Sequence, residues 1–153
     1  MDQSLDSDVL QQFVTIINDI PFNRILGLKL DTIETHGVTM RFAMTNELIG
    51  NFMHGILHGG VISAVLDMAG GVAAMVAAIQ KRANKNMEEL AAILSKAGTV
   101  SMHVDYIRPG KGQDFLASAH VLHSGNKISF TRMELHNQEN KLIAAGTATY
   151  MIG

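Results

Sequence analysis

The fold of this chain is decided by residues 59–80, which read GGVISAVLDMAGGVAAMVAAIQ. Between Val61 and Ile79 only Ser63 and Asp67 carry polar side chains, so a helix over this segment is apolar on all sides. Such a helix is either buried in protein or crosses a membrane. Ala and Gly are only weakly lipophilic, and Asp67 near the middle would cost about 2.5–3.5 kcal/mol in a bilayer. We therefore predict a helix over 59–80 that is buried in the protein, with no membrane span.

The sequence around this helix is typical of an α+β domain. The apolar residues of an amphipathic helix recur over residues 7–20, and residues 46–57 are predicted to be an irregular loop. A polar-leaning insert, residues 81–98, has helical character over 88–96. Period-two alternation or turn signals predict six strands, at residues 28–35, 38–45, 100–106, 115–123, 127–137 and 142–152.

This order of elements predicts one domain, residues 1–153, in which a six-stranded, mostly antiparallel sheet curls around the long helix. A single wrapped sheet leaves its outer strands as unpaired edges. Two copies of the chain could pair edge to edge and form one continuous sheet, which removes these edges. We therefore expect a homodimer, and favour two such dimers in a tetramer.

Composition narrows the possible functions. Charged residues make up 17% of the chain, against about 25% in an average domain, which favours extra buried surface such as a subunit interface. The net charge of −2 argues against nucleic acid as a partner. The absence of Cys excludes disulfides, Cys-ligated metals and a thiol nucleophile. The acidic start of the chain is unlike a signal peptide, so a cytoplasmic location is expected.

The start of the long helix has the features of an anion or oxyanion site. His58 precedes Gly59 and Gly60, and glycines let another molecule approach the backbone closely. The first N–H groups of a helix have no acceptor within the helix, and the helix dipole adds partial positive charge there. These groups can stabilise an oxyanion without a cationic side chain. The same glycine pair could also be a plain turn.

Asp67 is the only ionisable residue of the apolar helix. A buried carboxylate is costly unless it is paired or functional, so Asp67 is either a candidate catalytic group or a structural one. It follows Gly59 by eight residues, which places the two about 12 Å apart along the helix axis and on different sides of it. If both act on one substrate, the aspartate must therefore come from a second copy of the helix.

These residues resemble those of a known family. Residues 58–60 (HGG) with Asp67, followed by residues 98–100 (GTV) and 105–110 (DYIRPG), resemble the hotdog-fold thioesterases of the PaaI-like group. The likeness covers about residues 22–152. It implies a hotdog fold and the hydrolysis of acyl-CoA thioesters to free acid and CoA. Because a thioester is already an activated acyl group, no metal or organic cofactor is expected.

The resemblance also implies catalytic roles. Gly59 would supply the backbone N–H that polarises the thioester carbonyl, and His58 would help to position the thioester. Asp67 of the facing subunit would be the nucleophile or the base that activates water; we prefer attack by water. Thr99 falls where relatives carry a Ser or Thr that orients this water.

Substrate-binding residues are expected in two places. Gly60 lies beside the oxyanion site. Arg108, Pro109 and Lys111 lie where CoA phosphates pass in the family, although two basic residues in a loop could equally be solvated surface. The acyl chain that the substrate carries is left open, and so is the role of the insert at residues 81–98.

One position departs from the family pattern. Relatives carry an Asn six residues before the His of HGG, but this position is Phe52 here. Asn51 can serve as a catalytic residue only if the loop shifts by one. His120 and His123 have the spacing H-x-x-H, but they face opposite sides of a regular strand, so no metal site is expected.

Two alternative functions remain for such a sequence. A hotdog acyl dehydratase or hydratase would need a second acid in a different motif, which is not seen. A non-catalytic module that binds or senses acyl-CoA is the other alternative, and release of free thiol from a panel of acyl-CoAs would separate it from an enzyme.

Overall fold

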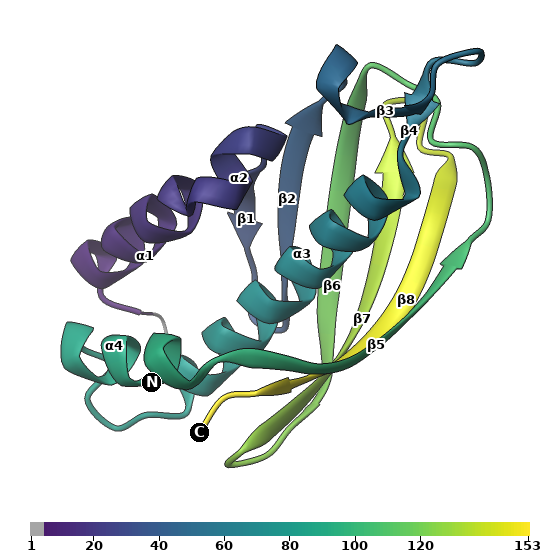
Figure 1. Ribbon diagram of the computed structural model, residues 1–153. Helices are drawn as coiled ribbons and strands as arrows, with labels where there is room; N and C mark the ends of the chain where they lie inside the picture. The colour runs from purple at the N-terminus through teal and green to yellow at the C-terminus, as the bar shows by residue number, and fades with distance from the viewer. Residues whose placement is uncertain (1–4) are drawn as a thin grey trace.

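The long apolar helix lies across the concave side of a curved sheet (Figure 1). In the computed structural model, which describes residues 5–153, this helix is α3, Gly59–Gln80. The sheet has six strands in the order β1-β2-β6-β7-β8-β5, and every neighbouring pair is antiparallel. The predicted α+β class, with a six-stranded antiparallel sheet around a central apolar helix, is confirmed. The strands are β1 (Lys29–Ile33), β2 (Gly37–Ala43), β5 (Gly98–Tyr106), β6 (Asp114–Ser124), β7 (Ile128–Asn137) and β8 (Leu142–Met151).

The core lies between α3 and the concave side of the sheet. Alternate residues of β7, from Ser129 to Asn137, are buried while their neighbours are not, as expected for a strand with one covered face. In β2 and β6 the rings of Phe42 and Phe115 stack with their centroids 5.1 Å apart. By length and composition α3 could also cross a membrane, but 67% of its most apolar window is buried inside the fold.

One side of α3 is less covered than predicted. Val65, Leu66, Ala69 and Val72 are fully buried, whereas Asp67 and its neighbours on the same side are only half-buried. The side that carries Asp67 therefore remains accessible in a single copy of the chain.

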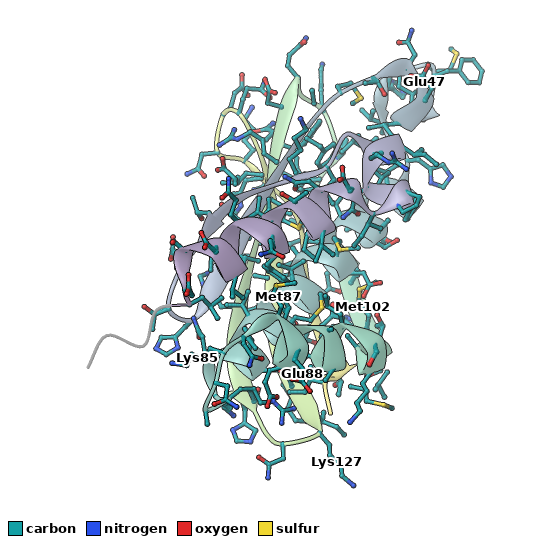
Figure 2. The ribbon with its side chains drawn as sticks, turned by 90° about the vertical axis from the view of Figure 1, so that its left-hand side faces the viewer. Glu47, Lys85, Met87, Glu88, Met102 and Lys127 are labelled. Atoms are coloured by element: carbon teal, nitrogen blue, oxygen red, sulfur yellow. The ribbon has the colours of Figure 1, made fainter. Side chains whose placement is uncertain are left out.

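Two further helices contribute to the core. The first, α1 (Ser7–Asp19), buries Val9, Phe13 and Ile17. The second, α4 (Met87–Lys96), forms most of the insert and buries Leu90 and Ile93. Figure 2 shows α1 and α4 one above the other on the same side of the molecule, with Met87 between them. The insert is thus part of the core packing rather than an exposed excursion.

The regions outside these elements differ from the sequence predictions. The predicted loop 46–57 contains a 3-10 turn, η1 (Asn46–Leu48), and a small hairpin of β3 (Ile49–Asn51) with β4 (Ile56–Leu57). Pro21 ends α1 as predicted, but it also occupies the first position of a second helix, α2 (Pro21–Leu26), where proline needs no N–H donor.

The predicted orientation of the two histidines of β6 is wrong. His120 pairs with Arg132 and His123 pairs with Phe130, because the register between β6 and β7 shifts at Leu122. This β-bulge adds one residue to β6, so His120 and His123 face the same side of the sheet. That side is solvent-exposed, and no group of three or more His, Asp or Glu side chains converges there or elsewhere within residues 5–153.

Candidate functional site

The first turn of α3 leaves one backbone donor unused. His58 is the N-cap residue, and its Nδ1 accepts a hydrogen bond from the Gly60 N–H at 2.7 Å. The N–H groups of Val61 and Ile62 donate to the His58 carbonyl. The Gly59 N–H has no acceptor in the described part of the chain. Gly59 therefore offers a free N–H at the positive end of the helix dipole, which is the requirement for an oxyanion site.

Gly59 and Gly60 differ in the space that the structure leaves for a side chain. A Cβ atom at Gly60 would lie 2.9 Å from Nδ1 of His58, so a side chain there would break the cap. A Cβ atom at Gly59 would lie 3.4 Å from the nearest atom of the Tyr106 ring, which is an ordinary contact. Since Nδ1 of His58 accepts a hydrogen bond from the Gly60 N–H, a neutral imidazole carries its proton on Nε2, where it can donate to a bound molecule.

Asp67 is held by hydroxyl groups from two strands. The Thr99 hydroxyl on β5 donates to Asp67 Oδ1 at 2.8 Å. The Tyr150 hydroxyl on β8 donates to the Asp67 main-chain carbonyl at 2.8 Å and to the same Oδ1 at 3.2 Å. Asp67 Oδ2 accepts no hydrogen bond from any residue between 5 and 153. One carboxylate oxygen is thus fixed, and the other is free to contact water or substrate.

Tyr150 remains a hydrogen-bond donor over the whole physiological range of pH. Its side chain is buried, and this burial is the main reason why the pKa of Tyr150 is raised well above its ordinary value. The negative charge of Asp67 and the hydrogen bond to it raise this pKa further. The phenol therefore keeps the proton with which it orients the Asp67 carboxylate.

A cavity of about 160 Å³ opens beside this carboxylate. Asp67, Thr99 and Tyr150 line one part of it. The remaining lining is mostly apolar or glycine, and comes from α3, the end of the insert and the end of β8: Met68, Gly71, Met75, Ala97, Gly98, Met151 and Ile152. The site therefore joins a positioned carboxylate to an apolar pocket.

A second and larger cavity, of about 620 Å³, has basic side chains around it. Arg108, Lys111 and Lys141 line it together with one acidic residue, Glu139. Lys141 forms an ion pair with Glu139 at 2.9 Å, and this contact lowers the pKa of the Glu139 carboxyl. Arg108 Nη1 donates to a main-chain carbonyl at 2.9 Å, and its other N–H groups donate to no residue in the described range 5–153.

The loop that lines this basic cavity packs against the strand that precedes α3. The N–H of Leu57, two residues before Gly59, donates to the carbonyl of Gly110 at 2.9 Å. A Cβ atom at Gly110 would lie 2.7 Å from Leu57 Cβ, so the loop that carries Pro109 and Lys111 packs closely on β4. This contact holds the loop beside the chain segment that leads into α3.

The residues predicted from sequence fall into three groups. His58, Gly59 and Gly60 lie at the start of α3, Asp67 and Thr99 touch each other, and Arg108, Pro109 and Lys111 line the basic cavity.

Asn51 belongs to none of these groups. Its Oδ1 accepts from the N–H of Met53 at 3.1 Å within the small hairpin, and the adjacent Phe52 is 83% exposed. Among the described residues, Asn51 thus forms a turn and makes no hydrogen bond to Asp67 or His58.

Sequence reasoning missed Tyr150. It is 83 positions from Asp67 and meets it only because β8 pairs with β5 in the sheet. A signal was present, since Tyr150 lies at an inward position of the strand predicted over residues 142–152. A buried tyrosine hydroxyl needs a polar partner, and Asp67 is the only ionisable residue of the helix below that sheet.

Comparison with known proteins assigns the family. Residues 54–144 match the Thioesterase superfamily, and the chain belongs to it. It is 41% identical over 134 residues to the medium/long-chain acyl-CoA thioesterase YigI of Escherichia coli K12, covering 88% of this chain and 86% of YigI. The prediction of a thioesterase-family enzyme is confirmed.

Solved structures support the same family and fold. A crystal structure from Shewanella oneidensis, described as related to the thioesterase superfamily, is 42% identical with a TM-score of 0.91, covering 96% of this chain and 97% of that one. The Escherichia coli PaaI protein has the same fold, with a TM-score of 0.77 at 18% identity over 98% of this chain and 96% of PaaI. The predicted hotdog fold of the PaaI-like group is confirmed.

Proposed function

We propose that this thioesterase hydrolyses acyl-CoA thioesters with medium to long acyl chains in a pocket shared by two subunits. The observation that carries the proposal is the free N–H of Gly59 at the start of the same helix on which Asp67 is anchored. The 41% identity to YigI, a medium/long-chain acyl-CoA thioesterase, and the apolar cavity beside Asp67 support this substrate class.

The thioester carbonyl oxygen would accept the Gly59 N–H. Negative charge develops on this oxygen when the carbonyl carbon is attacked, and a donor already in place stabilises that charge without reorganisation. The His58 Nε2–H lies in the same turn and would position the thioester. Gly60 supports this arrangement because only a glycine leaves room for the His58 cap.

Asp67 would be the base for attack by water. A water molecule held by Asp67 Oδ2 attacks the carbonyl carbon and transfers a proton to the carboxylate. The tetrahedral intermediate then collapses, the carbon–sulfur bond breaks, and the CoA sulfur leaves with the proton. Thr99 and Tyr150 hold Oδ1, so Oδ2 presents its lone pairs in a fixed direction.

Helix geometry supports a second subunit as the source of the aspartate. Asp67 and Gly59 of one chain are separated by about 12 Å along a rigid helix, so they cannot contact one thioester. β5 is an edge strand of the sheet, and it carries both Thr99, which touches Asp67, and Tyr106, whose ring covers Gly59. Antiparallel pairing of two β5 edges would bring Gly59 of the partner subunit toward Asp67.

The basic cavity would hold the CoA portion of the substrate. Arg108 and Lys111 would contact its phosphates, with Pro109 fixing the loop between them. Arginine and lysine are the usual phosphate-binding side chains, and three of the four residues of this cavity that carry a formal charge are basic. A cytoplasmic location and the assembly of dimers into a tetramer stay predictions.

Subunit complementation tests the shared pocket. Gly59→Pro removes the free N–H, and proline fits the first position of a helix. Asp67→Ala removes the base. Each variant alone should be nearly inactive on a panel of acyl-CoAs, whereas coexpression should restore about a quarter of wild-type activity, because half of randomly mixed dimers hold one intact pocket of two. If the mixture is no more active than the two variants alone, both residues serve one pocket within a chain and the proposal is wrong.

A further inference from the structure

The cavity beside Asp67 follows α3 away from the predicted oxyanion site. Its α3 residues are Asp67, Met68, Gly71 and Met75, so the cavity extends along about 12 Å of helix axis. Ala97, at the junction of α4 and β5, also lines the cavity. Asp67 is the first of these α3 residues, and the lining other than Asp67, Thr99 and Tyr150 consists of Met, Ala, Ile and Gly residues.

Packing within the chain requires glycine at neither of the two glycines of this wall, Gly71 and Gly98, and Gly71 is the one that lies inside a helix. A Cβ atom at Gly71 would have only the Tyr150 ring within 4 Å, with its nearest atom at 3.4 Å, which is an ordinary contact. At the preceding position, Gly70, a Cβ atom would lie 2.4 Å from Tyr150 Oη and 2.9 Å from Thr131 Oγ1. Packing therefore demands glycine at 70 and permits alanine at 71.

The local conformation gives no reason for this glycine either. Gly71 lies in the interior of α3, and its φ is not positive. Glycine destabilises a helix interior relative to alanine, because it loses more backbone entropy on folding. A residue that weakens the helix and fills no steric need keeps space free in the cavity that it lines.

We propose that Gly71 determines the length of acyl chain that the enzyme accepts, by leaving room for the methylene groups that follow the thioester carbonyl beside Asp67. The inference rests on the proposed acyl-CoA hydrolysis and names the residue that selects among its substrates. Met68 and Met75 suit the same role, because unbranched thioethers adapt their rotamers to chains of different length. A side chain at position 71 would occupy the space next to the reacting carboxylate and exclude long chains first.

The test compares Gly71→Ala and Gly71→Val with wild type on butanoyl-, octanoyl-, dodecanoyl- and hexadecanoyl-CoA. Ala77→Val is the matched control, since Ala77 is a half-buried position of the same helix outside the cavity. We expect the ratio of kcat/KM for hexadecanoyl-CoA to that for butanoyl-CoA to fall about 10- to 200-fold in Gly71→Val, the range that a change of one methylene in an apolar pocket produces. The ratio for Gly71→Ala should lie between the ratios for Gly71→Val and wild type, and the ratio for Ala77→Val should equal that of wild type.

Measurements of thermal stability and of ligand binding distinguish a loss of folding from a change in chain-length selection. Gly71→Ala should raise Tm by about 2–4 °C, which shows that lost activity is not lost folding. Binding of non-hydrolysable acyl-CoA thioethers of the same four lengths should show the same chain-length shift. An equal change across all lengths in rate and binding, or none, overturns the role of Gly71. A wild-type protein that hydrolyses none of the four substrates refutes the proposed function instead, while the thioether series still reads the effect of Gly71 on chain length.

Discussion

Replacing Tyr150 by Phe removes one oxygen atom and tests whether the orientation of Asp67 limits the rate. The ring stays in place, because it is buried and packs on Gly70. Two hydrogen bonds are lost, at 2.8 Å to the Asp67 carbonyl and at 3.2 Å to Oδ1. The carbonyl keeps its acceptor role within α3, so the loss that concerns catalysis is the bond to the carboxylate.

The expected fall in kcat follows from the contact that remains on the Asp67 carboxylate. A hydrogen bond to a charged group contributes about 1.5–3 kcal/mol. The bond from Tyr150 is long, and the Thr99 hydroxyl still holds the same oxygen at 2.8 Å, so the lower end applies. Since about 1.4 kcal/mol corresponds to a factor of ten, kcat for the preferred acyl-CoA should fall about tenfold. KM should change little, because the substitution removes only the hydroxyl, which contacts Asp67, and leaves the ring that lines the acyl cavity.

The assay is steady-state release of free CoA, with thermal unfolding measured in parallel. Tm should fall by about 2–4 °C for a hydrogen bond of about 1 kcal/mol in a chain of this size. A double variant with Thr99→Val should lose more kcat than the product of the two single losses, because each single variant leaves one anchor on Oδ1. A Tyr150→Phe enzyme with wild-type kcat and a lowered Tm would refute the argument and leave Tyr150 a purely structural role.

Four further predictions follow from the same geometry. Gly59→Pro should lower kcat by about 10²- to 10³-fold, whereas Gly59→Ala, which keeps the N–H, should not. The ψ of 137° at His58 suits a following proline, so the circular dichroism spectrum of Gly59→Pro should match that of the wild type. Asp67→Asn should lower kcat by about 10²- to 10⁴-fold with acyl-CoA binding retained in equilibrium titration. Arg108→Ala with Lys111→Ala should raise KM for acyl-CoA but not for a pantetheine thioester that lacks the nucleotide phosphates. The raised pKa keeps Tyr150 protonated in the folded chain, whereas the unfolded chain ionises it above about pH 10. Above this pH the free energy of unfolding of the wild type should therefore fall by up to ~1.4 kcal/mol per pH unit. Urea unfolding should show this fall in the wild type and not in Tyr150→Phe.

The sequence was most informative where structure is local. The helix over residues 59–80 has the predicted ends, because the glycines after His58 begin it and the polar run from Lys81 ends it. The segment Ile49–Leu57 is predicted to be a loop but forms a small hairpin. Its strands have only three and two residues. A contact outside them holds the hairpin, because the His58 N–H donates to the Leu48 carbonyl at 2.8 Å. No periodicity exists in so short a segment.

In the site, too, only the residues that are close in sequence could be predicted together. His58, Gly59 and Asp67 lie within ten residues and could be predicted together, because one helix relates them. The contact between Asp67 and Tyr150 depends on the strand order of the sheet, and the facing of His120 and His123 depends on a bulge at Leu122. A bulge shifts the alternation by one residue, but only His123 and Ser124 follow it in β6, which is too short a run for alternation to reveal the shift.

The position of donor and base on one helix has a consequence for how the enzyme is assembled. A helix fixes both the separation and the relative direction of two positions, so Gly59 and Asp67 cannot be brought together by a local movement of the chain. Side-chain flexibility does not help either, because the donor is a backbone N–H and the carboxylate is tied to two strands. In the proposed pocket, catalysis therefore requires pairing of subunits. The low content of charged residues and the half-buried face of α3 are then consequences of the same requirement, since that face must be apolar enough to meet a second copy and open enough to admit the acyl chain.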